Sequence, residues 1–434
     1  MLKVVDVCTR IEGHGNVKLF LQNDEISQVE FEIAPYRGFE NILIGKKLID
    51  IPKIVSRICG LCHASQAIVS CKAIEDLYGI QANEQSINLR HILMTGELIK
   101  SHSMHFFFHS LPDLFLIFNI SQKLFSPYEL IKYDPQLTTN LYELIKIGNE
   151  IDKIFGGRSV HLITLIPGGV IYSHSRKNFT MARKYLQKAL INLEWVIEKF
   201  IELFSNYNPP EEFSLPDITY FGLNNFGNYD RYSGILRIKE NKKKIIDFQE
   251  TDYSSYFDKD SNLRGIDFYF DKGKKVLVGP LSRYNIIENY GIDNVSTYLK
   301  YFDKSWKNNI LFANFIRLIE MFIEINQGLK ILEDPTLSNI DILPSLNSVK
   351  KSEGIGVIEA PRGILLHHYY INERNLIEQV KLFIATEINI PLINEMITKY
   401  AYKLYEKTGD INLVKKKIQV IIRAFDPCIA CATH

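Results

Sequence analysis

Apolar residues recur every three or four positions along several long segments of the chain, which is the spacing of amphipathic helices. The spacing is most regular in residues 181–205. Within residues 91–118, Pro112 is expected to kink or end the helix, because proline lacks a backbone hydrogen-bond donor. The segments predicted to be helical are 52–78, 91–118, 181–205, 306–332, 371–383 and 391–407.

Two shorter stretches have the alternating pattern of β-hairpins. Residues 17–33 place two apolar strands around an Asn-Asp turn, and residues 266–278 place two more around a Lys-Gly turn. The second hairpin falls within residues 212–290, which are rich in Asp, Asn, Tyr and Gly. The whole pattern predicts a mainly α protein with small β excursions, an α+β fold. We expect one large domain over residues 1–434, with 212–290 as a peripheral α/β excursion.

Composition limits the classes of protein to which the chain could belong. The chain has 434 residues, and 46% of them are hydrophobic, which is enough for a large core. Its 51 basic and 50 acidic residues nearly cancel, which argues against a nucleic-acid partner. No run of about 20 apolar residues is free of charge, so no transmembrane segment is predicted. Asp6 and Arg10 come too early for a secretory signal, and six cysteines are too few for a disulfide scaffold, so a reducing, cytoplasmic location is expected.

Four of the six cysteines form two C-x-x-C pairs near opposite ends of the chain. Cys59 and Cys62 lie in RICGLC, and Cys428 and Cys431 lie in DPCIACATH. Four thiolates are a complete tetrahedral set for a soft or borderline metal. Structural zinc sites usually close over loops of roughly 15–20 residues, whereas most of the chain separates these two pairs. Spacing favours a central functional metal, and it leaves open a structural zinc ion and thiols that never meet.

Other motifs occur along the chain in a fixed order. They are TRIEGHG (9–15), YRGFENIL (36–43), SHSMHFFFHSLPD (101–113), FGGRSVHLITLIPGGV (155–170), VGPLSRY (278–284) and IEAPRG (358–363). Together with the two cysteine motifs, this ordered set resembles the large subunit of the nickel–iron hydrogenases, and residues 212–275 are its least similar part. The resemblance implies the family's helical-bundle body, with a metal site at its centre formed by the two C-x-x-C pairs.

The same resemblance implies a Ni–Fe(CN)2CO centre held by the four cysteines. Cys59 and Cys428 match the terminal nickel ligands. Cys62 and Cys431 match the ligands that bridge nickel to an iron carrying carbon monoxide and cyanide. Thiolates suit soft nickel, and a terminal thiolate is also a base beside the metal. The implied activity is the reversible heterolytic cleavage of H2 into protons and electrons.

Five further residues match positions around the family's catalytic centre. Glu12 matches the carboxylate that carries the proton away. A glutamate suits this role because a carboxyl group with a raised pKa can alternate between proton acceptor and proton donor. Arg362 matches the guanidinium over the open metal position, and Asp113 and Asp426 match the carboxylates that hold it. Thr386 matches a hydroxyl that hydrogen-bonds an iron cyanide.

A second cation site is implied at the last residue. His434 matches a ligand of magnesium or a similar cation, with Glu40 as its carboxylate partner and the backbone carbonyl of Leu382 as a third ligand. The chain departs from the family at Gln66, where a histidine usually donates a hydrogen bond toward a cysteine sulfur. A glutamine amide can also donate, but it cannot carry a proton at neutral pH.

Electrons must leave through a partner chain, because no cysteines remain for iron–sulfur clusters. The resemblance implies an iron–sulfur small subunit, together with further electron-transfer subunits of the NAD(P), F420 or heterodisulfide reductase kind. Two alternatives to a catalytic role are weighed. A non-catalytic relative, such as the quinone-reductase subunit of the same fold, would have lost the cysteine pairs. A structural zinc protein would leave Glu12, Arg362 and His434 without a role.

Overall fold

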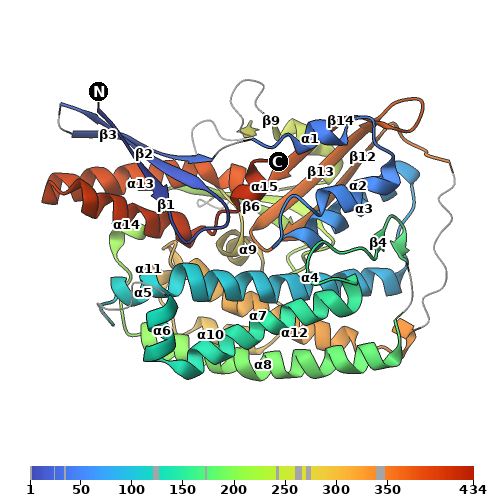
Figure 1. The fold of residues 1–434 in the computed structure, drawn as a ribbon, viewed down its shortest axis with the longest axis horizontal. Helices are drawn as coiled ribbons and strands as arrows, with labels where there is room; N and C mark the ends of the chain where they lie inside the picture. The colour runs from blue at the N-terminus through green and yellow to red at the C-terminus, as the bar shows by residue number, and fades with distance from the viewer. Residues whose placement is uncertain are drawn as a thin grey trace.

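The computed structural model of the chain describes nine stretches of residues. They are 2–23, 25–33, 36–120, 127–171, 174–240, 244–259, 266–269, 275–338 and 348–434. A bundle of long helices forms one side of the molecule, and sheets with their own covering helices form the other (Figure 1). In the described part of the chain, no helix is long and apolar enough to cross a membrane.

Four long helices make up the bundle. They are α4 (Glu84–Met104), α7 (Pro135–Gly156), α8 (Arg176–Phe204) and α12 (Phe312–Ile331). Helices α4 and α7 approach closely because each has a glycine at the contact: a Cβ atom on Gly148 would lie 2.6 Å from the carbonyl oxygen of Gly96. The apolar stripe predicted for residues 181–205 is buried on α8, at Leu186, Ala189, Leu193, Val196, Ile197, Phe200 and Phe204.

Helix α4 does not end in a regular way. It passes into a π-helical turn at His105–Ser110, and α5 (Leu111–Ile117) follows with Pro112 in its first turn. Regular α-helix is thus interrupted just before Pro112, as predicted. Single π-helical turns are often found at functional sites because they re-aim the side chains they carry.

An antiparallel sheet lies on the other side of the molecule. Its strands are β12 (Glu353–Ala360), β13 (Gly363–Ile371) and β14 (Ile377–Ile384), in that order. Helix α3 (His63–Tyr78) packs on β12 and β13. This packing requires glycine at two positions of β12. A Cβ atom on Gly354 or Gly356 would lie 2.2 or 2.3 Å from a carbonyl oxygen of α3.

A second sheet covers the opposite face of β12–β14. Its strands run in the order β11 (Lys275–Leu277), β6 (Ile218–Asn224), β7 (Ile235–Glu240), β8 (Ile245–Phe248). Side chains from both sheets, among them Phe221, Val357, Leu366 and Phe383, form one apolar cluster. All seven residues of β6 are buried, so part of the 212–290 range lies inside the molecule.

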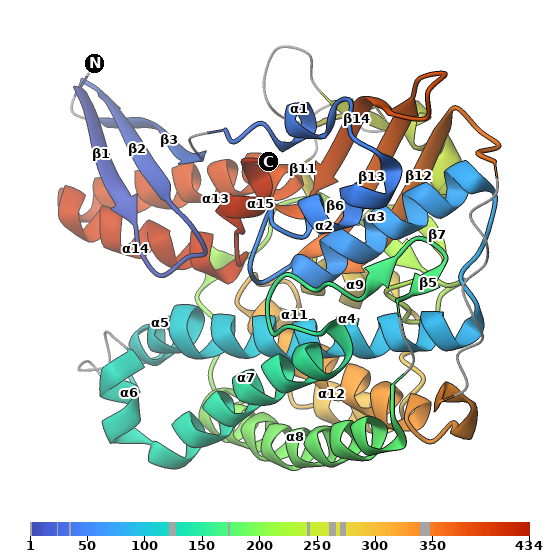
Figure 2. The same ribbon diagram turned by 45° about the vertical axis from the view of Figure 1, so that its right-hand side comes forward.

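The N-terminal strands lie against the C-terminal helices (Figure 2). Strands β1 (Leu2–Cys8), β2 (Gly15–Gln22) and β3 (Glu25–Ile33) form an antiparallel sheet, so the hairpin predicted for residues 17–33 is confirmed. Helix α13 (Ala385–Thr408) is fixed to β3 by hydrogen bonds between the side chains of Asn394 and Thr398 and the strand backbone. Helix α14 (Ile411–Ala424) packs against α13 and leads to the second cysteine pair.

Two elements differ from the prediction. Residues 371–383, predicted to be helical, form the end of β13 and most of β14. Apolar residues at 377, 380 and 384 fit helical spacing, but in so short a run they fit a buried strand equally well. The predicted hairpin of residues 266–278 is also wrong: β10 (Ile266–Phe268) pairs with β9 (Phe257–Lys259), and β11 pairs in parallel with β6. The turn predicted at residues 272–273 lies outside the described residues.

The remaining helices are short and connect these parts. The helix predicted for residues 391–407 is α13, and it begins six residues before Pro391. The predicted segments 52–78 and 306–332 are each divided in two by a loop. The short helices are α1 (Phe39–Leu43), α2 (Ile51–Val55), α6 (Pro127–Tyr133), α9 (Pro280–Ile286), α10 (Asn294–Leu299), α11 (Lys304–Lys307) and α15 (Ile429–Ala432).

Candidate metal centre

The two C-x-x-C pairs meet at the centre of the molecule. Cys59 lies in the loop after α2, and Cys62 directly precedes the first residue of α3. Cys428 caps α15, which carries Cys431. The four sulfur atoms all lie within 4.8 Å of one another, and each residue is at most 4% exposed. The prediction of a central four-thiol site, rather than thiols that never meet, is confirmed.

The thiols form a donor set that suits a metal cation. Cys428 Sγ lies 3.4 Å from Cys59 Sγ and 2.7 Å from Cys431 Sγ, and no disulfide joins them. Hydrogen bonds from the other thiols hold the pKa of Cys59 well below its usual value, whereas burial and the neighbouring thiols raise the pKa of Cys428. One thiolate is therefore favoured in the free cluster. The other thiols need the charge of bound metal to ionise, and a buried, soft, four-sulfur set fits nickel and iron.

Arg37, from the motif YRGFE, joins the two cysteine segments. Its guanidinium donates hydrogen bonds to the carbonyl oxygens of Ile58 and Ala430, which directly precede cysteines of the two pairs. Its backbone N–H donates to the carbonyl oxygen of Thr433 at 2.6 Å. Since the same side chain holds both segments, it fixes the distance between the two pairs. Sequence reasoning gave Arg37 no role, because nothing in the motif indicates backbone acceptors so distant in sequence.

Arg362 reaches the cluster from the loop between β12 and β13. Its Nη1 lies 3.1 Å from Cys62 Sγ, and its Nη2 and Nε donate to the side chain and the backbone carbonyl of Asp426. Burial lowers the pKa of Arg362, but the negative charges of Asp426 and the thiolates outweigh it and hold that pKa well above its usual value. Arg362 is thus a permanent cation beside the sulfur atoms.

Asp113 does not bind Arg362, contrary to the sequence expectation. Its carboxylate pairs with Arg423, with a 2.5 Å contact to Nε, and with Arg10. Of the two predicted carboxylates, only Asp426 holds Arg362 in the part of the chain that the structure describes. The motif placed Asp113 in the right region, but three arginines converge there and the sequence could not assign the pairs.

Glu12 lies between the N-terminal strands and the second cysteine pair. Its backbone pairs with Cys428 as an isolated parallel bridge, and its carboxylate accepts the N–H of Ala430 at 3.0 Å. Burial raises the pKa of Glu12, and the negative charge of Cys59 raises it further. A carboxyl group with a raised pKa next to a thiol cluster suits proton transfer.

Two of the residues predicted for a second cation site, Glu40 and His434, lie side by side at the last residue. His434 Nε2 lies 3.5 Å from Glu40 Oε1, and its Nδ1 lies 2.8 Å from the carbonyl oxygen of Cys431. When Nδ1 donates to that carbonyl, Nε2 carries the free lone pair that a metal requires. The backbone N–H of Leu382 donates to Glu40. Lys259 Nζ lies 3.4 Å from His434 Nε2 as well, so in this structure an ammonium group faces the nitrogen that a metal would need.

Thr386 and Gln66 complete the wall of the cluster, and both line a small cavity with Cys62, Cys428 and Cys431. The Thr386 hydroxyl oxygen accepts the backbone N–H of Cys428 at 2.9 Å. Its predicted hydrogen bond to a cyanide stays a prediction.

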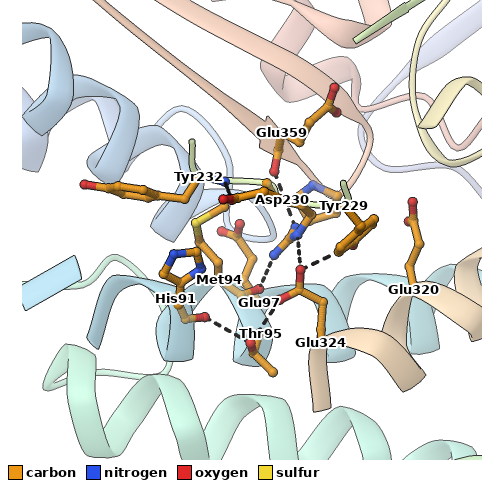
Figure 3. Close-up of polar contacts among 12 residues, drawn as sticks. His91, Met94, Thr95, Glu97, Tyr229, Asp230, Tyr232, Glu320, Glu324 and Glu359 are labelled. Carbon is orange, nitrogen blue, oxygen red and sulfur yellow. Dashed lines mark hydrogen bonds and ion pairs between the residues drawn. The ribbon is translucent and has the colours of Figure 1, made fainter. Parts of the chain in front are cut away.

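A network of buried charges joins the sheets to the bundle (Figure 3). Glu324 of α12 accepts hydrogen bonds from Thr95, Tyr229 and Arg231 at 3.0, 3.2 and 2.7 Å. Arg231 in turn donates to the carbonyl oxygen of Met94 at 2.8 Å. The network therefore fixes the loop before β7 between two helices of the bundle.

Arg283, from the motif VGPLSRY, extends this network to the loop of Arg362. It donates to Glu320 at 2.5 and 2.7 Å and to Glu359 at 2.6 Å. It also donates to the two backbone carbonyls that precede Arg362, at 3.2 and 3.0 Å. We expect Arg283 to hold the Arg362 loop in place.

Replacing Arg283 with methionine is expected to destabilise the protein by about 3–5 kcal/mol, because it leaves Glu320 and Glu359 as buried charges without their partner. Urea denaturation followed by circular dichroism measures the change. The matched control is Arg183→Met, since the salt bridge of Arg183 with Glu333 is exposed and contributes at most about 1 kcal/mol. Equal denaturation midpoints for the two variants would contradict this role of Arg283.

The histidines at positions 102, 105 and 109 are not cluster ligands, in agreement with the sequence interpretation. His102 bonds Glu320 at 3.0 Å, and His105 bonds the carbonyl oxygen of Arg423 at 2.7 Å. Burial lowers the pKa values of His102 and His109 to about 4, so both are neutral at physiological pH.

The chain belongs to the nickel-dependent hydrogenase family. The family's sequence profile matches residues 37–124 and 270–434, which include both cysteine pairs and every predicted site residue except Glu12. The chain is therefore an oxidoreductase of the hydrogenase class, and the resemblance inferred from the motifs is confirmed. The four thiols argue against a non-catalytic relative that has lost its cysteine pairs, and the match to the nickel-dependent hydrogenase family favours the catalytic interpretation over structural zinc.

Characterised relatives cover nearly the whole chain. The F420-non-reducing hydrogenase vhc of Methanococcus voltae contains a subunit that is 28% identical over 99% of this chain and 94% of its own length. The beta subunit of the NAD-reducing hydrogenase HoxS of Cupriavidus necator is 29% identical over the same shares. The crystal structure of an NAD+-reducing [NiFe]-hydrogenase in the H2-reduced state superposes with a TM-score of 0.93 at 25% identity, covering 100% of both chains.

Proposed function

We propose that this chain is the catalytic subunit that cleaves H2 heterolytically and reversibly at a Ni–Fe(CN)2CO centre. The observation that carries the proposal is the convergence of four buried thiols with the Arg362 guanidinium, which lies 3.1 Å from Cys62 Sγ. The bound metals would supply the open coordination position at which H2 is polarised. Cys59 and Cys428 would hold nickel alone, and Cys62 and Cys431 would be shared with iron.

The surrounding side chains would manage charge and protons. Arg362 places a fixed positive charge next to the sulfur atoms in a dry site, where electrostatic interactions are strong. Asp426 keeps that guanidinium in place through two hydrogen bonds. Glu12 would accept the proton that leaves the Cys428 sulfur, since its backbone is paired with Cys428 and its pKa is raised.

Electrons would leave through an iron–sulfur small subunit. Cys8 and Cys71 are the only cysteines outside the cluster, and burial raises the pKa of each to about 12. Among the described residues they join no further group that could hold a metal. One relative is a subunit of an NAD-reducing hydrogenase, which supports an NAD(P) module as the next partner. Another relative is a subunit of an F420-non-reducing hydrogenase, which gives no support to an F420 module. A cytoplasmic location stays a prediction.

The C-terminal site would hold Mg2+ or a similar cation through Glu40, His434 and the Leu382 carbonyl. Glu40→Gln is expected to lower bound magnesium to background while nickel is retained, because an amide oxygen lacks the charge that a hard cation prefers. Elemental analysis of the purified variant measures both metals. Glu353→Gln is a suitable control, since that carboxylate lies far along β12 and pairs with His368. Magnesium retained in Glu40→Gln would refute the ligand assignment.

Elemental analysis of the native complex tests the proposal as a whole. We expect about one nickel per chain, as one four-thiolate set holds one nickel ion, together with iron beyond what the partner's clusters require. Infrared bands of carbon monoxide and cyanide would identify the iron ligands. One zinc ion per chain with no nickel would overturn the proposal and make the four sulfur atoms structural.

A further inference from the structure

The second cysteine of the N-terminal pair stands at the position that normally caps a helix. Cys62 directly precedes α3, and its carbonyl oxygen accepts the N–H of Gln66 at 3.0 Å. The N–H groups of the first helical turn have no partner within the helix itself. A side chain at the capping position usually accepts the N–H of the second or third helical residue, and in α3 these residues are Ala64 and Ser65.

The other cysteine pair shows what a cysteine does at such a position. Cys428 precedes α15, and its Sγ accepts the N–H of Cys431, the third residue of that helix, at 3.3 Å. Within α3, which the structure describes in full, no N–H donates to the side chain of Cys62. The two pairs therefore differ, because the sulfur of Cys428 bonds its own helix and the sulfur of Cys62 does not.

A glutamate from another helix accepts the N–H groups of α3 instead. Glu97 of α4 accepts the N–H of Ala64 at 2.7 Å through Oε1, and both of its oxygens lie 3.2 Å from the N–H nitrogen of Ser65. The Ser65 hydroxyl donates to Glu97 Oε2 as well. All three residues are fully buried, so water does not replace these hydrogen bonds. Glu97 thus occupies the place of a cap that Cys62 leaves vacant.

The next turn of α4 ties the two helices together beside Glu97. Lys100 Nζ lies 2.8 Å from Nε2 of His63, the first residue of α3. It also donates to Asp152 of α7 at 2.6 Å and to the carbonyl oxygen of Ser159 at 3.2 Å. Helix α4 therefore meets the start of α3 with a carboxyl group for its backbone and an ammonium group for its first side chain, which fixes Glu97 at the capping position.

We propose that Glu97 is a positioning residue, which caps α3 in place of Cys62 and so leaves the Cys62 sulfur to the metals. The inference rests on the proposed function, in which nickel and iron share Cys62. A ligating sulfur that accepts a hydrogen bond gives less electron density to its metals. Arg362 Nη1 already lies 3.1 Å from Cys62 Sγ, and Glu97 prevents α3 from adding a second donor to the same sulfur.

The test compares two variants that carry the same charge. Glu97→Gln and Glu97→Met are both neutral and reach about equally far, but only glutamine retains a strong acceptor for the N–H of Ala64. In Glu97→Met, the N–H groups of the first turn are expected to bond the Cys62 sulfur. Iron then receives less electron density, so the carbon monoxide band in the infrared spectrum of the purified complex should lie at higher wavenumber in Glu97→Met than in Glu97→Gln.

Glu84→Gln and Glu84→Met form the matched control pair. Glu84 is an exposed residue in the first turn of the same helix, so both control variants should keep the native band.

A double variant covers the case in which Glu97→Met binds no metal. Proline in place of Ala64 has no N–H to donate, and the prolines in the first turns of α2 and α5 show that helices of this protein accept one there. Adding Ala64→Pro to Glu97→Met is expected to restore any nickel that was lost and to move the band back toward that of Glu97→Gln.

Two results would overturn the inference. One is a carbon monoxide band at the same position in Glu97→Met and Glu97→Gln. The other is a double variant that neither regains nickel nor moves the band back. A native complex without nickel or without a carbon monoxide band would instead refute the proposed function itself.

Discussion

Cys428→Ser is expected to abolish nickel binding and with it all H2 oxidation. Serine replaces a soft thiolate with a hard hydroxyl that does not ionise at neutral pH, and the remaining three sulfur atoms no longer form a complete set. Cys428 also lies at the centre of the cluster, 3.4 Å from Cys59 Sγ and 2.7 Å from Cys431 Sγ. Each 1.4 kcal/mol of lost binding free energy lowers affinity about tenfold, so nickel should fall to background in elemental analysis.

Cys8→Ser is the matched control for this experiment. Cys8 is also buried, and burial raises its pKa to about 12, so it stays a thiol and does not serve as a metal ligand. The control should keep nickel and activity, at the cost of a small loss of stability. Normal nickel content in Cys428→Ser would mean that the metal is bound elsewhere, and the site assignment would have to be abandoned.

Glu12→Gln is expected to retain both metals and lose proton transfer. The glutamine oxygen can still accept the N–H of Ala430, so the local fold is kept, but an amide cannot take up the proton. General acid–base groups typically contribute about 10²–10⁴ to the rate, and H2 oxidation should fall by that factor. Conversion between para and ortho hydrogen, which needs only the metal and the nearest base, should persist.

One further measurement, the stability of the variant as a function of pH, separates this role from a structural one. Burial and the charge of Cys59 raise the pKa of Glu12 in the folded protein. Ionising Glu12 therefore lowers the free energy of unfolding once the pH rises above the pKa that Glu12 has in the unfolded chain. Glu12→Gln removes that cost, and its stability relative to the native chain should increase as the pH rises above about 4.3. Glu406→Gln, on an exposed turn of α13, should match the native protein in both assays. H2 oxidation at the native rate in Glu12→Gln would exclude it as the proton carrier.

Short motifs predicted most of the metal centre, because its chemistry depends on residue types at fixed local spacings. The two C-x-x-C pairs could be identified in this way, and they meet in one buried site. The roles expected of Arg362, Glu40 and His434 stay predictions. The partners of these residues could not be predicted, because they come from distant segments. Arg37 bonds only backbone carbonyls, and its role follows from the fold rather than from the motif.

The wrong predictions also arise from contacts between segments that are distant in the sequence. Residues 371–383 were predicted to be helical because their apolar spacing fits both structures, and only pairing with β13 decides between them. Asp113 was assigned to Arg362, but three arginines lie within reach of the two acidic residues.

The distribution of the four sulfur ligands imposes an order on synthesis. Cys59 and Cys428 are 369 positions apart, so at about 5–20 residues per second the ribosome takes on the order of tens of seconds to deliver the second pair after the first. During that interval the nascent chain displays a lone dithiol, to which copper binds more readily than nickel or iron. Selective loading is therefore a matter of timing. If nickel and iron are inserted only after α13 and α14 have packed on the N-terminal strands, they meet all four sulfur ligands. The lone dithiol then does not compete for these metals.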